Sequence, residues 1–409
     1  MRCSGMKSSH QKVLFVNGLP VDIGGIEKTI MEVYRGINHE NLLIDFAVRK
    51  PEKGHFHDEI EAYGGRVFNL FIKTKHKGNR RWNILMDLYF IYSLYRLLKR
   101  EGPYTAIHIA NPLLDGFSII SAKLAKVPIR IAHSHNTGID DKSKPKMTNI
   151  YIRKLRIWFC KRYATHIWGC SKAACEYLFG KGIMMDKRTE VVPNPINIKK
   201  FIDSQFYDKS SIYKELGVCK DNINLLHVGR YTEQKNQLFL LEVFAEMLRQ
   251  TPQVFLIIIG IGHLEKQIKD RIIELKIERN VLLLDSKTDI SKVLAICDAF
   301  LLPSIYEGFG NVLIEAQAAG VRCFASDACQ PEANLGLIEY ITLDRGAEYW
   351  AKYILLKLNK DLKDLKDLKM GIDHNDLLKF DLSVIGPKME EVYLNGSKYN
   401  SLFLKKNER

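Results

Sequence analysis

The stretch Ala299-Phe300-Leu301-Leu302-Pro303-Ser304-Ile305-Tyr306-Glu307-Gly308-Phe309-Gly310-Asn311-Val312-Leu313-Ile314-Glu315-Ala316 runs from an apolar strand through a loop with two glycines into a helix. This order predicts one βα unit of a parallel sheet. A helix N-terminus presents unpaired N–H groups and a positive dipole end, which favours a diphosphate. Glu307 could reach a sugar hydroxyl, and Glu315, two turns into the helix, a ribose diol. By spacing alone, an ordinary βα turn with a solvated Glu315 explains the stretch equally well.

The first half of the chain shows the same alternation of short apolar runs and helical patterns. The predicted strands are 13–16, 44–48, 66–70, 106–110 and 129–133, and the predicted helices are 26–37 and 82–99. Short apolar strands that alternate with helices are typical of a doubly wound parallel sheet. We therefore predict a Rossmann-like α/β domain here.

The second half repeats this alternation after a segment rich in proline and asparagine, 191–197, which we interpret as a linker. The predicted strands are 225–229, 254–260, 281–285, 299–302, 323–325 and 340–343, and the predicted helices are 237–248, 264–275, 290–297, 312–319 and 356–369. A chain of 409 residues is too long for one core. We predict an N-terminal domain at 1–193, a second Rossmann-like domain at 194–375 and C-terminal helices at 376–409.

Two further motifs follow predicted strands. In Gly229-Arg230-Tyr231-Thr232-Glu233-Gln234-Lys235, two cations stand five residues apart. Arg offers a fork and Lys a point charge to phosphate oxygens, although spacing alone favours two surface cations beside Glu233. Gly260-Ile261-Gly262 lacks the third glycine of a dinucleotide fingerprint, because Glu265 stands there.

Two histidines, His133 and His135, follow the strand at 129–133, and strand alternation places them on the same side. A histidine at a strand end can hydrogen-bond a sugar hydroxyl. A metal pair is the alternative, but no third ligand stands nearby in the sequence, so we expect no metal site.

Together these motifs resemble family 4 of the retaining glycosyltransferases, and within it the bacterial enzymes that build capsular polysaccharides and exopolysaccharides. The resemblance extends from about Val13 to about Tyr393. It rests on Glu-x7-Glu from Glu307 to Glu315, on Gly-Arg…Lys at 229–235, and on Ala316-Gln317-Ala318-Ala319-Gly320, Ser326-Asp327, Pro331-Glu332 and Gly24-Gly25-Ile26-Glu27.

The resemblance implies the GT-B fold, in which two Rossmann-like domains face a central cleft. The acceptor binds on the N-terminal side and the donor on the C-terminal side, and the final helices cross back to the first domain. It implies catalytic roles for His135, with His133 as the alternative, and for Arg230, Lys235 and Glu307. It implies donor-binding roles for Gly24, Gly25, Gly229, Gly308, Phe309, Gly310, Asn311, Val312, Leu313 and Glu315. An acidic residue is frequent in the family where Ile261 stands, which puts that loop's nucleotide contact in doubt.

The implied reaction is metal-independent transfer of a hexose with retention of configuration. It needs no cofactor beyond a nucleotide-diphosphate sugar donor, which we expect to be a UDP-hexose. The expected acceptor is a growing glycan linked to polyprenyl diphosphate, in the synthesis of a capsule, exopolysaccharide or lipopolysaccharide.

The bulk properties agree with an enzyme that handles anionic ligands. Lys plus Arg number 61 against 47 Asp plus Glu, a net charge of +14, which favours nucleic acid, anionic lipid or phosphorylated substrates. The eight cysteines form no C-x-x-C pair, as expected in a reducing cytoplasm. No apolar run is long enough for a signal peptide or membrane helix. Basic and aromatic residues interleave at 73–95 and 153–162, which predicts either peripheral contact with anionic membrane at its inner face or solvated helix faces.

Other functional classes remain as alternatives. A UDP-sugar epimerase of the same fold would not need the Glu-x7-Glu pattern, and a dehydrogenase would need the full glycine fingerprint. A basic nucleic-acid-binding protein fits the charge, but no recognised motif is present and we expect no nucleic-acid partner. A non-catalytic scaffold would leave the joint presence of Arg230, Lys235, Glu307 and Glu315 unexplained.

Overall fold

The computed structural model describes residues 11–17, 25–49, 53–70, 80–137, 147–360 and 374–399, without the side chains of residues 80–84, 147–149, 360 and 374. The chain divides into two compact units. The first draws on Met1–His135, Pro145–Pro195 and Leu382–Arg409, and the second on Asn136–Lys144 and Ile196–Asp381. The predicted divisions lie after residues 193 and 375, and the structure places the corresponding divisions after Pro195 and Asp381.

The first unit is built on a seven-stranded sheet in the order β3-β2-β1-β4-β5-β6-β7, with every described pair parallel. Its strands are β1 (Gln11–Asn17), β2 (Leu42–Val48), β3 (Val67–Asn69), β4 (Ala106–Ile109), β5 (Ile129–Ser134), β6 (His166–Gly169) and β7 (Thr189–Val191). Two short strands, β6 and β7, are absent from the predicted set; a histidine and a tryptophan stand among the four residues of β6, and β7 has three residues. The predicted Rossmann-like sheet is confirmed.

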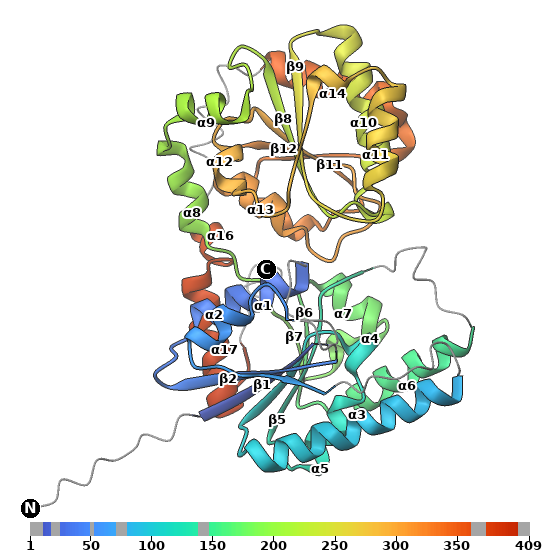
Figure 1. Cartoon of the computed structure of the whole chain (residues 1–409), viewed down its shortest axis with the longest axis vertical. Helices are drawn as coiled ribbons and strands as arrows, with labels where there is room; N and C mark the ends of the chain where they lie inside the picture. Colours follow the sequence, from blue (N-terminus) through green and yellow to red (C-terminus); the bar gives the residue numbers. More distant parts are fainter. Residues whose placement is uncertain are drawn as a thin grey trace, which may run out of the picture. The chain divides into compact units, whose positions relative to one another are not determined.

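Helices cover both faces of this sheet. They are α1 (Gly25–Gly36), α2 (His57–Ala62), α3 (Arg80–Glu101), α4 (Pro112–Asp115), α5 (Ser118–Leu124), α6 (Met147–Tyr163), α7 (Lys172–Phe179) and α17 (Leu382–Asn395). Figure 1 shows α1 and α17 on one side and α3, α5 and α6 on the other. Strand alternation in β1 directs Val13 and Phe15 into one core and Leu14 and Val16 into the other.

The C-terminal helix α17 packs on α1 at a close approach of two backbones. A Cβ added at Gly386 would lie 2.3 Å from the carbonyl oxygen of Gly36, and one at Gly36 would lie 2.3 Å from a side-chain carbon of Leu382. Real Cβ atoms do not approach backbone so closely, so Gly386 needs glycine, whereas a Cβ at Gly36 would require the Leu382 side chain to move. This contact attaches α17, the last described helix, to the rest of the first unit.

The second unit is built on a six-stranded parallel sheet in the order β10-β9-β8-β11-β12-β13. Its strands are β8 (Ile223–Val228), β9 (Val254–Ile259), β10 (Val281–Leu284), β11 (Ala299–Leu302), β12 (Arg322–Ser326) and β13 (Ile338–Ile341). These match the six predicted strands to within a few residues, so the second Rossmann-like sheet is also confirmed.

The helices of the second unit are α8 (Ile198–Asp203), α9 (Lys209–Leu216), α10 (Gln237–Gln250), α11 (Glu265–Glu274), α12 (Ile290–Leu294), α13 (Asn311–Ala318), α14 (Gly346–Lys360) and α16 (His374–Leu378). Figure 1 shows α10 and α11 on one side of the sheet and α12 and α13 on the other. The predicted helix at 356–369 begins earlier, as α14, and residues 361–369 lie outside the described residues.

No helix in the described part of the chain is both long and apolar enough to cross a bilayer.

Candidate active site

The candidate residues of the second unit lie at the carboxyl ends of its two central strands, β8 and β11. From this pair the chain adds β9 and β10 on one side and β12 and β13 on the other. Parallel α/β sheets bind ligands at such a switch point, because the loops diverge there and leave a crevice. The loop after β8 carries Arg230 and Lys235, and the loop after β11 carries Glu307.

Lys235 and Glu307, 72 residues apart in the sequence, form an ion pair in which Nζ lies 2.5 Å from Oε1. The Glu307 side chain is 6% exposed and that of Lys235 is 15% exposed. Ser304 Oγ donates a second hydrogen bond of 2.7 Å to the same carboxylate oxygen. The site therefore holds a cation and an anion in fixed positions within a mostly buried environment.

The turn after β8 returns Lys235 toward the strand end. The residues Glu233–Lys235 form a 3-10 turn, and Asn236 then takes a left-handed conformation with φ of 56° before α10. Asn is among the residues that tolerate this conformation. A Cβ at Gly229 would lie 2.9 Å from Lys235 Cγ, so the glycine gives the lysine side chain room to pass over the backbone.

The loop that carries Glu307 is held by hydrogen bonds to two neighbouring loops. Ile305 N donates to Gln234 O at 2.8 Å, and Gln234 Nε2 donates to Tyr306 O at 3.0 Å. Gln330 Nε2 donates to the carbonyl oxygen of Glu307 at 3.0 Å. These bonds fix the backbone on both sides of Glu307, which restricts the directions that its carboxylate can take.

Helix α13 begins at Asn311, directly after Gly310, whose φ is 88°. In any α-helix the N–H groups of the first turn point out of the N-terminus, because no carbonyl of the helix lies there to accept them. Leu313 N donates to Gly310 O at 2.9 Å, and the Leu313 side chain is fully buried. A positive helix end thus follows the Glu307 loop, as the sequence predicts.

Not all the predicted donor-site side chains face outward. Phe309 is 3% exposed, and its ring lies 5.2 Å from that of Phe380. Gly308 is also buried. At these positions a ligand could contact only the N–H and C=O groups of the backbone, because the phenyl ring packs inside the unit.

Arg230 and Glu315 are more accessible. Arg230 is exposed, and among the described residues its guanidinium makes no hydrogen bond or ion pair. Glu315 is half-buried on α13. Two glycines of the neighbouring loop, Gly260 and Gly262, would each bring a Cβ within 2.4 Å of a carbonyl oxygen, of Gly229 and Tyr231 respectively. In the structure these two glycines allow the loops after β8 and β9 to pack closely.

Other predicted site residues belong to the first unit. Gly25 begins α1 and is exposed, with open space where a Cβ would stand. Gly24 lies outside the described residues. His135 follows β5 and is half-buried, and its Nδ1 lies 3.1 Å from Asn194 Oδ1.

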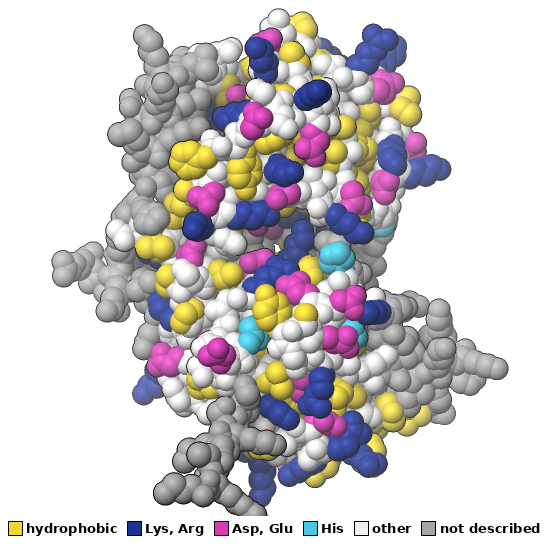
Figure 2. Space-filling view, turned by 60° about the vertical axis from the view of Figure 1, so that its left-hand side comes forward, with side chains coloured by type: hydrophobic (Ala, Val, Ile, Leu, Met, Phe, Trp, Pro, Cys, Tyr) yellow, Lys and Arg dark blue, Asp and Glu magenta, His cyan; other side chains and the backbone are white. Residues whose placement is uncertain are grey.

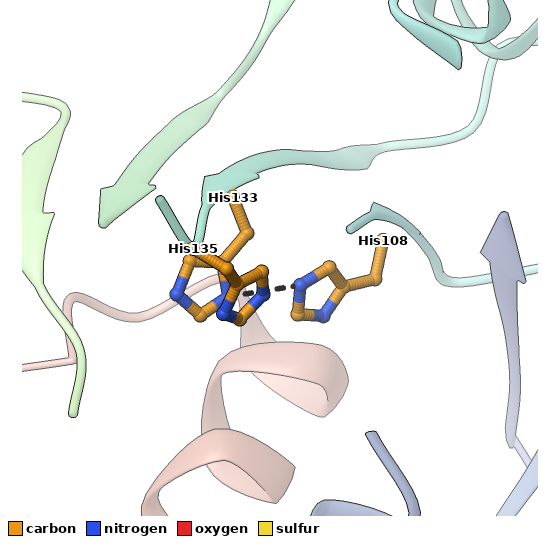
Figure 3. Close-up of side chains that lie close together, drawn as sticks. All are labelled: His108, His133 and His135. Carbon is orange, nitrogen blue, oxygen red and sulfur yellow. Dashed lines mark hydrogen bonds between the residues drawn. The ribbon is translucent and has the colours of Figure 1, made fainter. Parts of the chain in front are cut away.

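His135 belongs to a cluster of three histidines, with His108 from β4 and His133 from β5 (Figure 3). Burial lowers the pKa of all three, to about 4 for His135 and well below the usual range for the others. A backbone hydrogen bond at Val192 partly offsets the lowering of the His133 pKa. At neutral pH the cluster therefore carries no charge.

Sequence reasoning missed three residues that the structure adds to the site. Ser304 bonds Glu307, Gln330 holds its backbone, and His108 joins the two predicted histidines. Ser304 stands three residues before Glu307 in the quoted stretch, so its position was a usable signal. Gln330 and His108 come from other strands or loops and have no such signal.

Comparisons with known proteins identify both halves of the chain. A family model described as Glycosyltransferase Family 4 matches residues 23–200, and one described as Glycosyl transferases group 1 matches residues 208–341. The chain is 30% identical over 355 residues to the putative glycosyltransferase EpsF of Bacillus subtilis strain 168, covering 85% of this chain and 88% of that protein.

A second relative is UDP-Gal:alpha-D-GlcNAc-diphosphoundecaprenol alpha-1,3-galactosyltransferase of Escherichia coli. It is 25% identical over 331 residues, covering 79% of this chain and 81% of that protein. Among solved structures, Anabaena HepE in complex with UDP has a TM-score of 0.73 and 19% identity, covering 93% of this chain and 99% of that one. That likeness shows the shared fold.

Proposed function

The chain belongs to family 4 of the glycosyltransferases, and we propose that it moves a hexose from a nucleotide-diphosphate sugar to a lipid-linked saccharide with retention of configuration. The observation that carries this proposal is the buried pair of Lys235 and Glu307, at the switch point of the second sheet. Beside them, Arg230 and the N-terminus of α13 offer positive charge to a diphosphate.

In the proposed reaction the leaving group is a nucleoside diphosphate, so negative charge builds on its oxygens as the sugar bond breaks. Arg230 and Lys235 hold these oxygens, and fixed cations lower the energy of that charge without a metal at the diphosphate. The N–H groups near Phe309–Val312 add hydrogen bonds, and Gly308 and Gly310 let the backbone approach the phosphates.

The two carboxylates are assigned to the two sugars of the donor. Glu307, fixed by Lys235 and Ser304, orients the hexose, and Glu315 accepts hydrogen bonds from the ribose diol. No protein nucleophile takes part, and the leaving phosphate takes the acceptor proton on the same face. The family resemblance assigns to the first unit a hydrogen bond from His135 to a hexose hydroxyl and an approach of Gly24-Gly25 to the phosphates.

Similar proteins support a UDP-sugar as the donor and a lipid-linked saccharide as the acceptor. The Escherichia coli relative is named for UDP-Gal and for a saccharide on diphosphoundecaprenol, and the Anabaena structure contains UDP. The acceptor lies in a membrane, so the proposal also requires the enzyme to approach a bilayer surface.

Helices α3 and α6 of the first unit supply a surface suited to that approach. The ion pair of Asp87 with Arg156, at 2.7 Å, joins the two helices. Both expose large apolar side chains, including Tyr92 at 56% and Trp158 at 55%. The exposed cations Arg96, Lys99, Lys154 and Arg162 lie on the same helices, a combination that favours anionic headgroups. The basic residues at 73–79 lie outside the described residues.

One face of the molecule lacks the surface that nucleic-acid binding would need. On the face shown in Figure 2, Lys and Arg side chains are interspersed with Asp and Glu side chains. A protein that binds nucleic acid without a dedicated motif needs a continuous basic surface to follow the phosphate backbone.

A thermal-shift panel of UDP, UDP-hexoses, GDP and ADP, without added metal, tests the donor site. Stabilisation by UDP and one UDP-hexose is expected, because a ligand of the folded state raises its apparent stability. Glu315→Ala should abolish the shift. Glu278 is an exposed glutamate of the same unit, and the control variant Glu278→Ala should keep the shift. Unchanged donor affinity in Glu315→Ala would remove the ribose assignment.

The transfer itself is tested with the identified UDP-hexose and a synthetic polyprenyl-diphosphate saccharide. Retention predicts an α-linked product from an α-linked donor, which the anomeric proton signals in NMR would show. A β-linked product would contradict retention, and conversion of the UDP-hexose without any acceptor would indicate an epimerase.

A further inference from the structure

Three histidines converge in the interior of the first unit. His108 lies on β4 and His133 on the neighbouring β5, while His135 follows the end of β5. His108 and His133 are each 2% exposed. One ring nitrogen from each of the three lies within 4.8 Å of the others, and Figure 3 shows the rings side by side, with His108 reaching toward the other two.

A hydrogen bond to Asn194 determines which nitrogen of His135 carries the proton. Asn194 Oδ1 can only accept, so the proton of neutral His135 lies on Nδ1, 3.1 Å away. His108 Nδ1 lies 2.8 Å from the Tyr393 hydroxyl, and its Nε2 lies 3.1 Å from His133 Nδ1. Bonds of this kind to the outer nitrogen are what orient metal-binding histidines.

One nitrogen of the cluster is left over for a ligand. His135 Nε2 is buried and has no hydrogen-bond partner among the described residues. Burying a polar nitrogen without a partner is costly, so native interiors nearly always provide one. The rings of His133 and His135 lie 3.9 Å apart, so the free nitrogen of His135 belongs to a ring that lies directly beside the His133 ring.

From this arrangement we infer that the His108–His133–His135 cluster binds a divalent first-row transition-metal ion, for which Zn²⁺ is the reference. A zinc ion with Zn–N bonds of about 2.0 Å in tetrahedral geometry needs about 3.3 Å between its nitrogen ligands. His108 Nε2 and His133 Nδ1 are already 3.1 Å apart, and a small rotation of the rings brings in His135 from a separation of at most 4.8 Å.

The surroundings of the cluster agree with a small ion. The histidines line a cavity of about 10 Å³ together with apolar residues such as Phe15, Pro193 and Met389, which is about the volume that one water needs. Three neutral imidazoles leave a fourth position for a water molecule, as in three-histidine zinc sites. Imidazole suits Zn²⁺, Co²⁺, Ni²⁺ and Cu²⁺, whereas Mg²⁺ and Ca²⁺ prefer oxygen ligands.

The first experiment measures binding to the wild-type chain. After dialysis against EDTA, stoichiometric Zn²⁺ should bind and raise the melting temperature, on the order of 5 °C at saturation, while Mg²⁺ and Ca²⁺ should not. Co²⁺ should give the visible absorption of a tetrahedral nitrogen site. The absence of both a stoichiometric Zn²⁺ site and a Co²⁺ spectrum would overturn the inference.

Variants then locate the site. His108→Gln and His133→Gln should each lose at least tenfold in Zn²⁺ affinity. The control His166→Gln removes a largely buried histidine of the same unit that bonds Ser397 O instead, and it should bind Zn²⁺ normally. All these proteins also carry Cys219→Ser, which removes an exposed thiol. Equal Zn²⁺ affinity in all of these proteins would assign the ion to another place and contradict the inference.

These readouts do not measure sugar transfer. An ion on His135 Nε2, with Nδ1–H donated to Asn194, takes the place of the hydrogen bond from His135 to a hexose hydroxyl and leaves the donor-site residues of the second unit unchanged. A chain that binds UDP but no Zn²⁺ would keep the proposed function and lose the metal site, and the reverse result would do the opposite. The proposed handling of the diphosphate by Arg230 and Lys235 does not call on this ion.

Discussion

Lys235 Nζ lies 2.5 Å from Glu307 Oε1, so the lysine expected to hold the donor diphosphate is paired with the glutamate expected to orient the donor sugar. The two side chains are mostly buried, and a buried charge is stable only when it is paired or solvated. The pair keeps the site formed without a ligand. An incoming diphosphate would share the lysine with the carboxylate rather than meet an isolated cation.

This pairing predicts strong coupling between the two residues in stability. Lys235→Met or Glu307→Gln alone leaves one buried charge unpaired, and each should lower the free energy of unfolding by about 3 kcal/mol. The double variant should lose much less than the sum, because it leaves no unpaired charge. Chemical denaturation of the four proteins measures the coupling, and additivity within about 0.5 kcal/mol would show that the pair is not a unit.

Arg230 should matter for turnover and not for stability. Its side chain is exposed and makes no interaction among the described residues, so Arg230→Ala should melt like the wild type. Loss of one positioned group on the developing charge should lower kcat about 100-fold or more. Arg279 is another exposed arginine of the same unit, so Arg279→Ala is the control. Near-normal turnover of Arg230→Ala would exclude this residue from the site.

The backbone at Gly310 should be required for donor binding. Its φ of 88° disfavours any residue with a Cβ, so Gly310→Ala should cost about 1–2 kcal/mol of stability and displace the start of α13. Gly336→Ala, at a φ of 106° with open space around it, should cost about as much stability. Calorimetric titration with UDP should show weaker binding in Gly310→Ala and unchanged binding in Gly336→Ala; equal affinity in both would contradict a role for this helix end.

His227 should make the stability of the second unit depend on pH. Burial lowers its pKa to about 4, with Nδ1 bonded to Leu301 O at 2.9 Å, whereas in the unfolded chain the pKa returns to about 6.5. Between these values the unfolded chain binds more protons, so stability is fully present above pH 6.5 and falls as the pH is lowered toward 4.

The measurement compares wild type with His227→Gln by urea denaturation between pH 7 and pH 4.5. The variant should lose a pH dependence of up to about 1.4 kcal/mol per pH unit. Identical slopes would mean that His227 is not the titrating group.

The exposed aromatic residues of α3 and α6 should control membrane binding. Trp158→Glu places a negative charge on this surface and should lower binding to vesicles that contain anionic lipid several-fold. Tyr349→Glu, at a 40% exposed tyrosine of the second unit, is the matched control. Equal vesicle binding in flotation assays of both variants would remove α3 and α6 as the membrane surface.

Much of the fold could be predicted because its signals are local. Apolar runs such as Val254–Ile259 can be buried only as central strands, and each is followed by a helical pattern. The strands absent from the prediction were β6 and β7, and the four residues of β6 include His166 and Trp168. A run that short gives no periodicity to measure, so only its pairing with β5 and β7 reveals it.

By itself, the sequence determined the βα units and the residues of the Glu307–Glu315 turn, since strand, glycine and helix signals lie within about 20 residues. The tertiary structure alone decided which side chains from different strands, loops and helices meet. It brought Lys235 to Glu307 and Tyr393 to His108, 285 residues apart. It also placed His108 beside His133, because β4 and β5 are neighbours in the sheet. Strand order and helix packing fix such contacts, and neither is written in local sequence patterns.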